Sequence, residues 1–155
     1  MLDSEKTMTL RKYRIKIRDT FNDHDGHGAY TFGSGNIYVG EFENNLFNGQ
    51  GKYTFANENS YFGSFKDGKR HGQGTYTYEN GSQYVGAFLD DTKNGQGTFT
   101  FASGNRYVGG FENDLFSGQG VYNLNDGSQY TGEFQNGKKH GKGDFIWSNG
   151  NKYTG

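Results

Sequence analysis

Hydrophobic and polar positions alternate in short runs along most of this chain. In residues 72–88, Tyr76 and Tyr78 alternate with threonines, and Tyr84, Gly86 and Phe88 alternate with smaller side chains. A period of two places every second side chain on one face, which is the pattern of a β-strand. The β-branched and aromatic content of both runs agrees with that assignment. The pattern therefore predicts paired strands, and the repeats show no 3.6-residue period that would indicate a helix.

A short polar turn separates the two predicted strands. Here it is residues 79–81, which end in Gly81, and equivalent turns recur at residues 33–35, 102–104, 125–127 and 148–150. Glycine at the last position suits a hairpin because it adopts positive φ without strain. One copy has Glu58 where the others have glycine, so we expect a locally altered turn there.

The whole pattern recurs every 23 residues. The aligned positions are Tyr38, Tyr61, Tyr84, Tyr107 and Tyr130; then Gly40, Gly63, Gly86, Gly109 and Gly132; then Phe42, Phe65, Phe88, Phe111 and Phe134. Fixed spacing of this kind is typical of a repeat array, in which each unit completes its core by stacking on its neighbours. The fold class predicted is all-β: an elongated repeat array of antiparallel β-hairpins that forms a single twisted sheet.

Two details of the packing are expected from the same pattern. Gly86 lies between Tyr84 and Phe88 on one face, and we expect a ring from an adjacent hairpin to fill the hollow beside it. Loops such as residues 66–71 are expected to join successive hairpins.

The chain is predicted to have an N-terminal leader and an array. Residues 1–20 form the leader. Within it, apolar and basic side chains alternate over residues 13–18, which predicts a strand that caps the edge of the sheet. A flexible leader is the alternative. Residues 21–155 form the array, with a half repeat at 26–37, full repeats at 38–60, 61–83, 84–106, 107–129 and 130–152, and a partial repeat at 153–155.

Composition and charge narrow the classes of function. The chain has 27 glycines, no cysteine and 17% aromatic residues, so Tyr and Phe must form the core. Residues 1–20 hold six basic and three acidic side chains, and the remainder holds ten basic and fourteen acidic ones. An acidic array disfavours nucleic acid as a partner. Without cysteine, a signal segment or a long apolar run, a cytoplasmic protein is expected.

The repeat closely resembles the MORN (membrane occupation and recognition nexus) repeat, whose pattern is Tyr-x-Gly-x-Phe-x-x-Gly-x-x-His-Gly-x-Gly. Residues 61–74 and 130–143 match it at every position, and the other three copies depart from it at the loop glycine and at the histidine. The resemblance covers residues 26–155. It implies an extended hairpin array without catalytic activity or a cofactor of its own, which acts as a docking scaffold in cytoskeletal or ciliary structures. Some members have been proposed to bind acidic phospholipids.

The function predicted is a non-enzymatic scaffold that binds a peptide or helix of a protein partner along an aromatic and glycine-lined sheet face. The residues expected on that face are Tyr38, Tyr61, Phe65, Tyr84, Phe88, Tyr107, Phe111 and Tyr130. The partial last repeat leaves a sheet edge that could join two copies as a homodimer, or that could mark truncation of a longer array.

Variation among the repeats suggests further contacts. Leu46, Phe47, Leu115 and Phe116 form two apolar pairs in predicted loops, where they either pack under a neighbouring hairpin or meet a partner. The equivalent basic positions support the alternative function, peripheral binding to acidic phospholipids, through Lys69, Arg70, Lys93, Lys138 and Lys139.

Few residues suggest reaction chemistry. His71 and His140 are three repeats apart, which is too far to share a metal. His24 and His27 lie among acidic residues, and we interpret this segment as a solvated loop rather than a metal site. Choline- and glycan-binding modules also use aromatic–glycine repeats, but they depend on several tryptophans, and this chain has only Trp147. No metal site and no catalytic residues are predicted.

Overall fold

The computed structural model describes residues 14–15 and 26–155, and every regular element in these ranges is a β-strand. The chain divides into two units, Met1–Glu79 and Asn80–Gly155. The first unit contains β1 (Arg14–Ile15), β2 (Gly26–Thr31), β3 (Ile37–Glu43), β4 (Leu46–Thr54), β5 (Ser60–Lys66) and β6 (Lys69–Thr77). The second contains β7 (Gln83–Leu89), β8 (Thr92–Thr100), β9 (Arg106–Glu112), β10 (Leu115–Asn123), β11 (Gln129–Gln135), β12 (Lys138–Ile146) and β13 (Lys152–Thr154).

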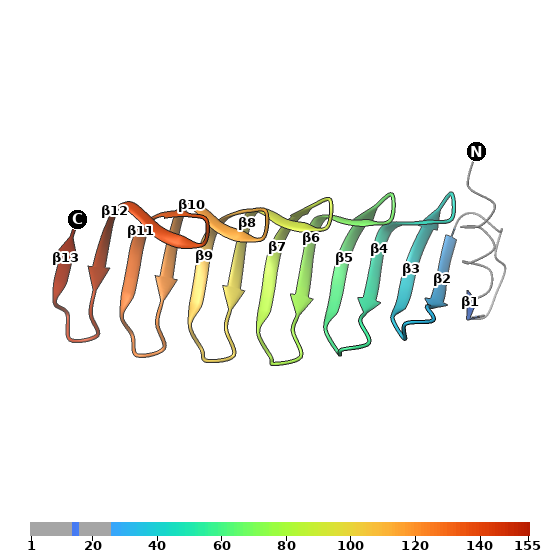
Figure 1. Ribbon diagram of the computed structural model, residues 1–155, viewed down its shortest axis with the longest axis horizontal. Coiled ribbons are helices and arrows are strands. Elements are labelled where there is room, and N and C mark those ends of the chain that lie inside the picture. The colour runs from blue at the N-terminus through green and yellow to red at the C-terminus, as the bar shows by residue number, and fades with distance from the viewer. Residues whose placement is uncertain (1–13, 16–25) are drawn as a thin grey trace. The chain divides into compact units, whose positions relative to one another are not determined.

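Within each unit, strands that follow one another in the chain are neighbours in an antiparallel sheet (Figure 1). The predicted all-β architecture of repeated hairpins is confirmed in both units. At the N-terminal end, Arg14 and Ile15 pair with Tyr30 and Ala29 of β2. The rest of the predicted capping strand lies outside the described residues.

Two kinds of turn connect the strands. The turns at residues 44–45, 67–68, 90–91, 113–114 and 136–137 have two residues, and both have positive φ. This is the type I′ geometry that matches the twist of a hairpin, and Asn, Asp and Gly adopt it most readily. The prediction of a loop at residues 66–71 is therefore wrong, because Asp67 and Gly68 alone make the turn and residues 69–71 already belong to β6.

The other connections are three-residue loops. In the loop after β4, the Phe55 amide donates to the Asn59 carbonyl at 2.9 Å, and the Glu58 amide donates to the Phe55 carbonyl at 3.0 Å. The loop at residues 102–104 has the same two bonds, at 2.8 and 2.9 Å, with glycine in place of Glu58. The expected altered turn is not observed: Glu58 adopts φ 71°, and the loop bonds hold it in that conformation.

A β-bulge in each hairpin sets the position of the core tyrosine. The register shifts between Gly40 and Phe42 in β3 and at equivalent places in the other repeats. The shift leaves the carbonyl of the intervening residue outside the regular ladder, and the tyrosine hydroxyl donates to it. Tyr38 donates to the Glu41 carbonyl at 2.8 Å, and Tyr107 donates to the Gly110 carbonyl at 2.9 Å. The buried hydroxyl and the bulge carbonyl thus satisfy each other.

The ring of the same tyrosine lies over a pair of glycines on facing strands. Gly109 is opposite Gly120, and a Cβ on Gly120 would lie 2.6 Å from the Tyr107 hydroxyl. A Cβ on Gly109 would lie 2.6 Å from the Gly120 Cα atom. The ring therefore comes from the same hairpin, and the prediction that an adjacent hairpin supplies it is wrong. The bulge directs the tyrosine across its own hairpin, where only hydrogen atoms leave room for it.

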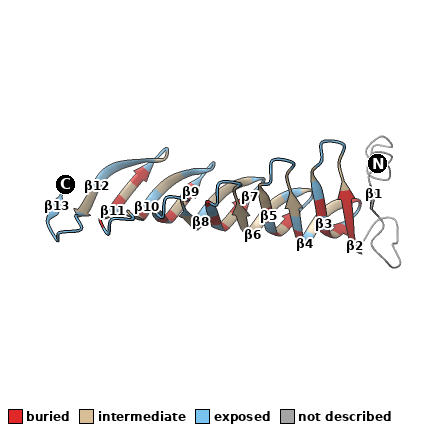
Figure 2. Ribbon diagram, turned by 90° about the horizontal axis from the view of Figure 1, so that it is seen from below, coloured by how far each residue is buried: buried red, intermediate tan, exposed pale blue. Residues whose placement is uncertain are grey.

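Neighbouring hairpins contact through the core phenylalanines. The Phe65 ring meets the Tyr38 ring of the preceding hairpin edge-on with centroids 5.1 Å apart, and Phe134 meets Tyr107 in the same way at 4.9 Å. Tyr38 and Tyr107 are fully buried, and Figure 2 shows the buried positions within the strands. Edge-to-face pairs of this kind each add about 1 kcal/mol beyond the area they bury.

Gly120 is predicted to be intolerant of any side chain, whereas Gly118 in the same strand is not. Gly120→Ala should destabilise the fold by about 3 kcal/mol, because the methyl group overlaps the Tyr107 ring. Gly118 has φ 71°, and a methyl group added to it would meet no atom within 4 Å, so Gly118→Ala should cost only about 1 kcal/mol. Urea unfolding of both variants measures the difference; equal losses would contradict the packing described.

Stability is predicted to fall between about pH 10 and pH 12. Burial raises the pKa of Tyr107 to about 12 from its ordinary value of 10.0. As the pH rises, the unfolded chain therefore loses the phenolic proton of Tyr107 at a lower pH than the folded chain does. The stabilisation is fully present below pH 10 and is lost as the pH rises through the folded pKa. Unfolding free energies measured across this range should fall more steeply for the wild type than for Tyr107→Phe. Identical slopes would contradict the assignment.

Candidate functional site

The eight rings predicted to form an exposed binding face are buried in the sheet. Tyr38, Tyr61, Tyr84 and Tyr107 have no exposed surface, and Phe65, Phe88, Phe111 and Tyr130 are between 4 and 8% exposed. Their side chains form the core described above, because the paired glycines let each tyrosine lie flat on its own hairpin. A partner cannot contact these rings in this structure, so a binding face must be made by other residues.

The two apolar pairs begin strands β4 and β10 and are not in loops. The Phe47 ring stacks on Tyr38 with centroids 3.8 Å apart, and Phe116 stacks on Tyr107 at 3.9 Å. Leu46 and Leu115 lie beside the turn glycines of the following hairpins, and Leu115 remains 47% exposed. Of the two alternatives, the structure favours packing for the phenylalanines.

The basic candidates for lipid binding fall into two groups. Three occupy the position of Phe47 and lie over rings: Arg70 is 5.5 Å from the Tyr76 centroid, Lys93 is 5.4 Å from Phe99, and Lys139 is 4.8 Å from Tyr130. Lys69 and Lys138 precede them in the chain and are exposed. Because successive strand residues point to opposite faces, Lys69 and Arg70 lie on different faces of their strand, and so do Lys138 and Lys139.

A half-buried row of rings lies on the core side of the sheet, near the three-residue loops. We name this row in the first unit the ring ladder; it consists of Phe32, Tyr53, Phe55, Tyr76 and Tyr78. Consecutive ring centroids along the ladder are 5.9, 4.7, 5.8 and 4.7 Å apart. The rings therefore touch in an unbroken series, and each keeps part of its surface exposed.

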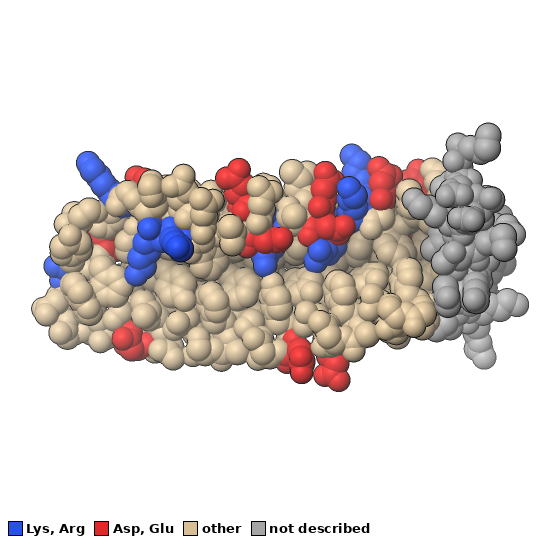
Figure 3. All heavy atoms as spheres, in the orientation of Figure 1, with Lys and Arg blue, Asp and Glu red and all other residues tan. Residues whose placement is uncertain are grey.

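The second unit has a similar but interrupted row. Phe99, Phe101 and Tyr122 follow one another with centroids 4.6 and 5.9 Å apart, and Phe145 and Trp147 lie 4.8 Å apart. Leu124 takes the ring position between these two groups. In Figure 3, the lower part of the visible face, toward the three-residue loops, shows no Lys or Arg.

Two of the ladder tyrosines are each fixed by an asparagine. The Asn36 side-chain oxygen accepts a hydrogen bond from the Ala56 amide at 2.9 Å, and its nitrogen donates to the Tyr53 hydroxyl at 3.0 Å. Asn59 makes the same two contacts, with the Glu79 amide at 2.8 Å and the Tyr76 hydroxyl at 3.2 Å. Since a backbone amide can only donate, the asparagine oxygen must face it, and the side-chain nitrogen must face the phenol.

The residue at the asparagine position varies together with the ladder ring. Where serine replaces asparagine, as at Ser82 and Ser128, its hydroxyl still accepts from a loop amide, at 3.0 and 3.1 Å. The rings at the corresponding position are then Phe99 and Phe145, which have no hydroxyl. A tyrosine hydroxyl is thus present where an asparagine can donate to it, as in the pair Asn105 and Tyr122.

Sequence analysis missed the ring ladder as a site. Its rings follow the 23-residue step as regularly as the core tyrosines do, so the two rows look alike in the sequence. The signal that separates them is the position of the glycine. The core tyrosine precedes its glycine by two positions, and the ladder rings follow theirs by two or four. The paired change of Asn–Tyr to Ser–Phe was also visible without a structure.

The opposite face of the first unit carries a few exposed apolar side chains. Ile37, Val39 and Phe62 are 38, 43 and 61% exposed. They alternate with polar neighbours such as Lys52, which is directly opposite both Val39 and Phe62 in the sheet. No row of contacting rings is formed on this face by the described residues.

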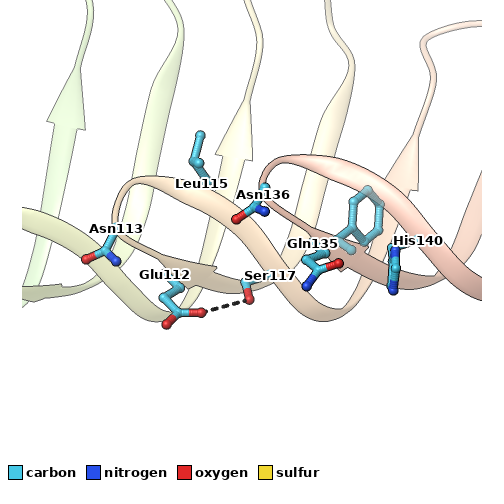
Figure 4. Close-up of a pocket in the computed structure, with 8 residues that line it drawn as sticks. Glu112, Asn113, Leu115, Ser117, Gln135, Asn136 and His140 are labelled. Carbon is cyan, nitrogen blue, oxygen red and sulfur yellow. Dashed lines mark hydrogen bonds between the residues drawn. The ribbon is translucent and has the colours of Figure 1, made fainter.

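A hollow of about 460 Å³ lies in the second unit between the hairpins β9–β10 and β11–β12 (Figure 4). Ser117 donates to the Glu112 carboxylate at 3.4 Å within it, and Figure 4 shows His140 apart from both. Nucleophilic catalysis of the triad kind uses a nucleophile and a base in hydrogen-bond contact, with a third group that orients the base. The hollow holds no such arrangement.

The described residues include no cluster of three or more His, Asp or Glu side chains that could hold a metal ion. His27 lies 3.6 Å from the Glu41 carboxylate at an exposed position, and His24 lies outside the described residues. Within residues 14–15 and 26–155, no helix is long and apolar enough to cross a membrane.

Solved structures that are similar to the chain include two of a Drosophila melanogaster protein. One is the TCP domain of Drosophila melanogaster SAS-4 in complex with a proline-rich motif of Ana2, with 13% identity, a TM-score of 0.47, and coverage of 92% of this chain and 96% of that one. The other is the TCP10c domain of Drosophila melanogaster Sas-4, with 14% identity, a TM-score of 0.45, and coverage of 92% and 98%. No curated protein matches the chain.

The family comparison agrees with the repeated hairpin that the structure shows. The MORN repeat model matches six consecutive segments, residues 21–37, 38–60, 61–83, 84–106, 107–129 and 130–152. The five full segments have the boundaries predicted from the spacing of the core tyrosines, and together the six cover most of the chain. This protein belongs to the MORN repeat family.

Proposed function

We propose that this protein is a scaffold that binds an extended segment of a protein partner across the ring ladder. The observation that carries the proposal is the unbroken series of half-buried rings in the first unit. Aromatic side chains held by their neighbours lose little conformational freedom on binding, and they supply much of the binding energy in protein interfaces. A partner that covered the exposed part of each ring would also bury apolar surface, which contributes further to the binding free energy.

The shape of the sheet suits a linear partner better than a small molecule. A small-molecule site is concave and buries most of its ligand, whereas the ladder is a row along one face of a single sheet. A segment of chain that lies across the strands could touch one ring after another. The same geometry suits a role in assembly, since several rings in a row can hold one partner along its length.

The phospholipid alternative has less support from the arrangement of charge. Arg70, Lys93 and Lys139 lie over rings. Within each unit, Arg70 and Lys139 point away from the face of the lysine that precedes them in the chain. Attraction to an anionic membrane requires several cations that reach the surface together. The cytoskeletal or ciliary setting that the family suggests, and the homodimer through a sheet edge, stay predictions.

Affinity capture from the native cell tests the proposal with two matched variants. Phe55→Leu combined with Tyr78→Leu removes two ladder rings and keeps apolar volume, and Phe62→Leu removes an exposed ring from the opposite face. Partners identified by mass spectrometry should fall at least about tenfold with the ladder variant and persist with Phe62→Leu.

Thermal unfolding of both variants shows whether the sheet remains folded. Equal capture by the wild type and a folded ladder variant would contradict the proposal. Loss of capture with Phe62→Leu alone would place the contact on the opposite face.

A further inference from the structure

We propose that the ring ladder recognises a proline-rich segment in the polyproline II conformation. This inference rests on the proposed function and specifies the chemistry of its partner. Three features of the ladder carry it: the spacing of the rings, the hydroxyl protons of Tyr53 and Tyr76, and the absence of charge on the ladder side chains.

The first feature is the repeat distance. Tyr53 and Tyr76 are equivalent rings of successive hairpins and lie two strands apart, which corresponds to about 10 Å across a sheet. A polyproline II helix rises about 3.1 Å per residue with three residues per turn, so every third residue returns to the same side after about 9 Å. One turn of the partner therefore advances by nearly one hairpin, and each turn can present one residue to the next pair of rings.

The second feature is the direction of the hydrogen bonds at the two tyrosines. Asn36 and Asn59 each donate to a phenol oxygen, at 3.0 and 3.2 Å, and the loop amides fix the orientation of both side chains. The phenol oxygens of Tyr53 and Tyr76 are therefore acceptors toward the asparagines, and their own protons remain to be donated. Neither hydroxyl donates to an acceptor among the described residues of the chain.

Carbonyl oxygens of a partner can accept these two protons in place of water. A polyproline II segment has no internal hydrogen bonds, so all its carbonyls are available, and proline has no amide proton that would itself need an acceptor. A helix uses its carbonyls internally except at the last turn. A strand has free carbonyls, but the side chains on one face recur every 6.6 Å or so, which does not match the hairpin repeat.

The third feature is the chemistry of the ring surface. Phe32, Phe55 and the tyrosine rings are uncharged, and proline rings pack well on aromatic faces in grooves of this kind. The Arg70 guanidinium already lies 5.5 Å from the centroid of Tyr76, on the core side of the ladder. A second cation on the same ring would meet this charge, so a lysine-rich or arginine-rich segment is disfavoured.

Binding of synthetic peptides to the full chain tests the inference directly. The probes are an oligoproline peptide of about nine residues, a glycine–serine peptide of equal length with the same ends, and an alanine-rich peptide that forms a helix. Calorimetry should detect binding of the oligoproline peptide and at least about tenfold weaker binding of the other two. Chemical shifts on titration should move for Tyr53, Phe55 and Tyr76 and not for Phe62.

A variant that copies the Ser–Phe repeats tests the hydroxyl protons without removing any ring. The variant carries four substitutions: Asn36→Ser, Tyr53→Phe, Asn59→Ser and Tyr76→Phe. They convert both pairs to the pattern of Ser82 and Phe99, which the protein already contains. The variant should keep its thermal stability and bind the oligoproline peptide about tenfold more weakly, because two donors are lost. Unchanged affinity would overturn the role of the hydroxyls.

The inference and the proposed function can fail separately. Any of three results would overturn the inference: no binding of the oligoproline peptide, equal binding of all three peptides, or chemical-shift changes confined to the face that carries Phe62. If cellular partners nevertheless depend on Phe55 and Tyr78, and the oligoproline peptide does not displace them, then the scaffold function stands and the ladder recognises another kind of segment.

Discussion

The structure depends on one interaction, in which a tyrosine lies over two facing glycines of its own hairpin and donates its hydroxyl to the carbonyl that a β-bulge leaves outside the ladder. Tyr107, Gly109 and Gly120 show the requirement: a methyl group on Gly120 would overlap the ring, and without the hydroxyl the Gly110 carbonyl would lose its donor. A single sheet has no second layer to bury its side chains. The flat ring therefore substitutes for that layer, and the next hairpin closes the remaining side with a phenylalanine edge.

The same arrangement explains why the candidate site lies where it does. The core tyrosines are buried, and the row of rings beside them, next to the three-residue loops, is a continuous aromatic surface that remains in part exposed. Asparagines that bridge successive loops hold two of these rings and orient their hydroxyl groups. The core row stabilises the hairpins, and the proposed recognition uses the neighbouring row. A ladder ring can change, as it does at Phe99, without disturbing the tyrosine that supports the hairpin.

Much of the fold could be predicted from the sequence because its 23-residue step and two-residue alternation leave few alternatives. The spacing of Tyr38 and its equivalents predicted the repeat boundaries, and alternation predicted the strands.

The site could not be predicted in the same way. Alternation places Tyr61 and Tyr76 on one face of their own strands, but it does not show that a bulge turns Tyr61 onto glycine and leaves Tyr76 half-covered. The bulge and the two-residue turns are set by backbone hydrogen bonds, and Glu58 shows that such bonds can hold a residue in a conformation its side chain disfavours.

If the ring ladder recognises a partner, the bound partner must cover the ladder side chains and leave the opposite face of the sheet exposed. Side-chain labelling by hydroxyl radicals, followed by mass spectrometry, measures this coverage residue by residue for the protein alone and for its complex with a captured partner. Tyr53 and Tyr76 should become protected in the complex, while Phe62, which is 61% exposed, should react equally in both states. Protection of Phe62 with unchanged reactivity of the two tyrosines would contradict recognition by the ring ladder.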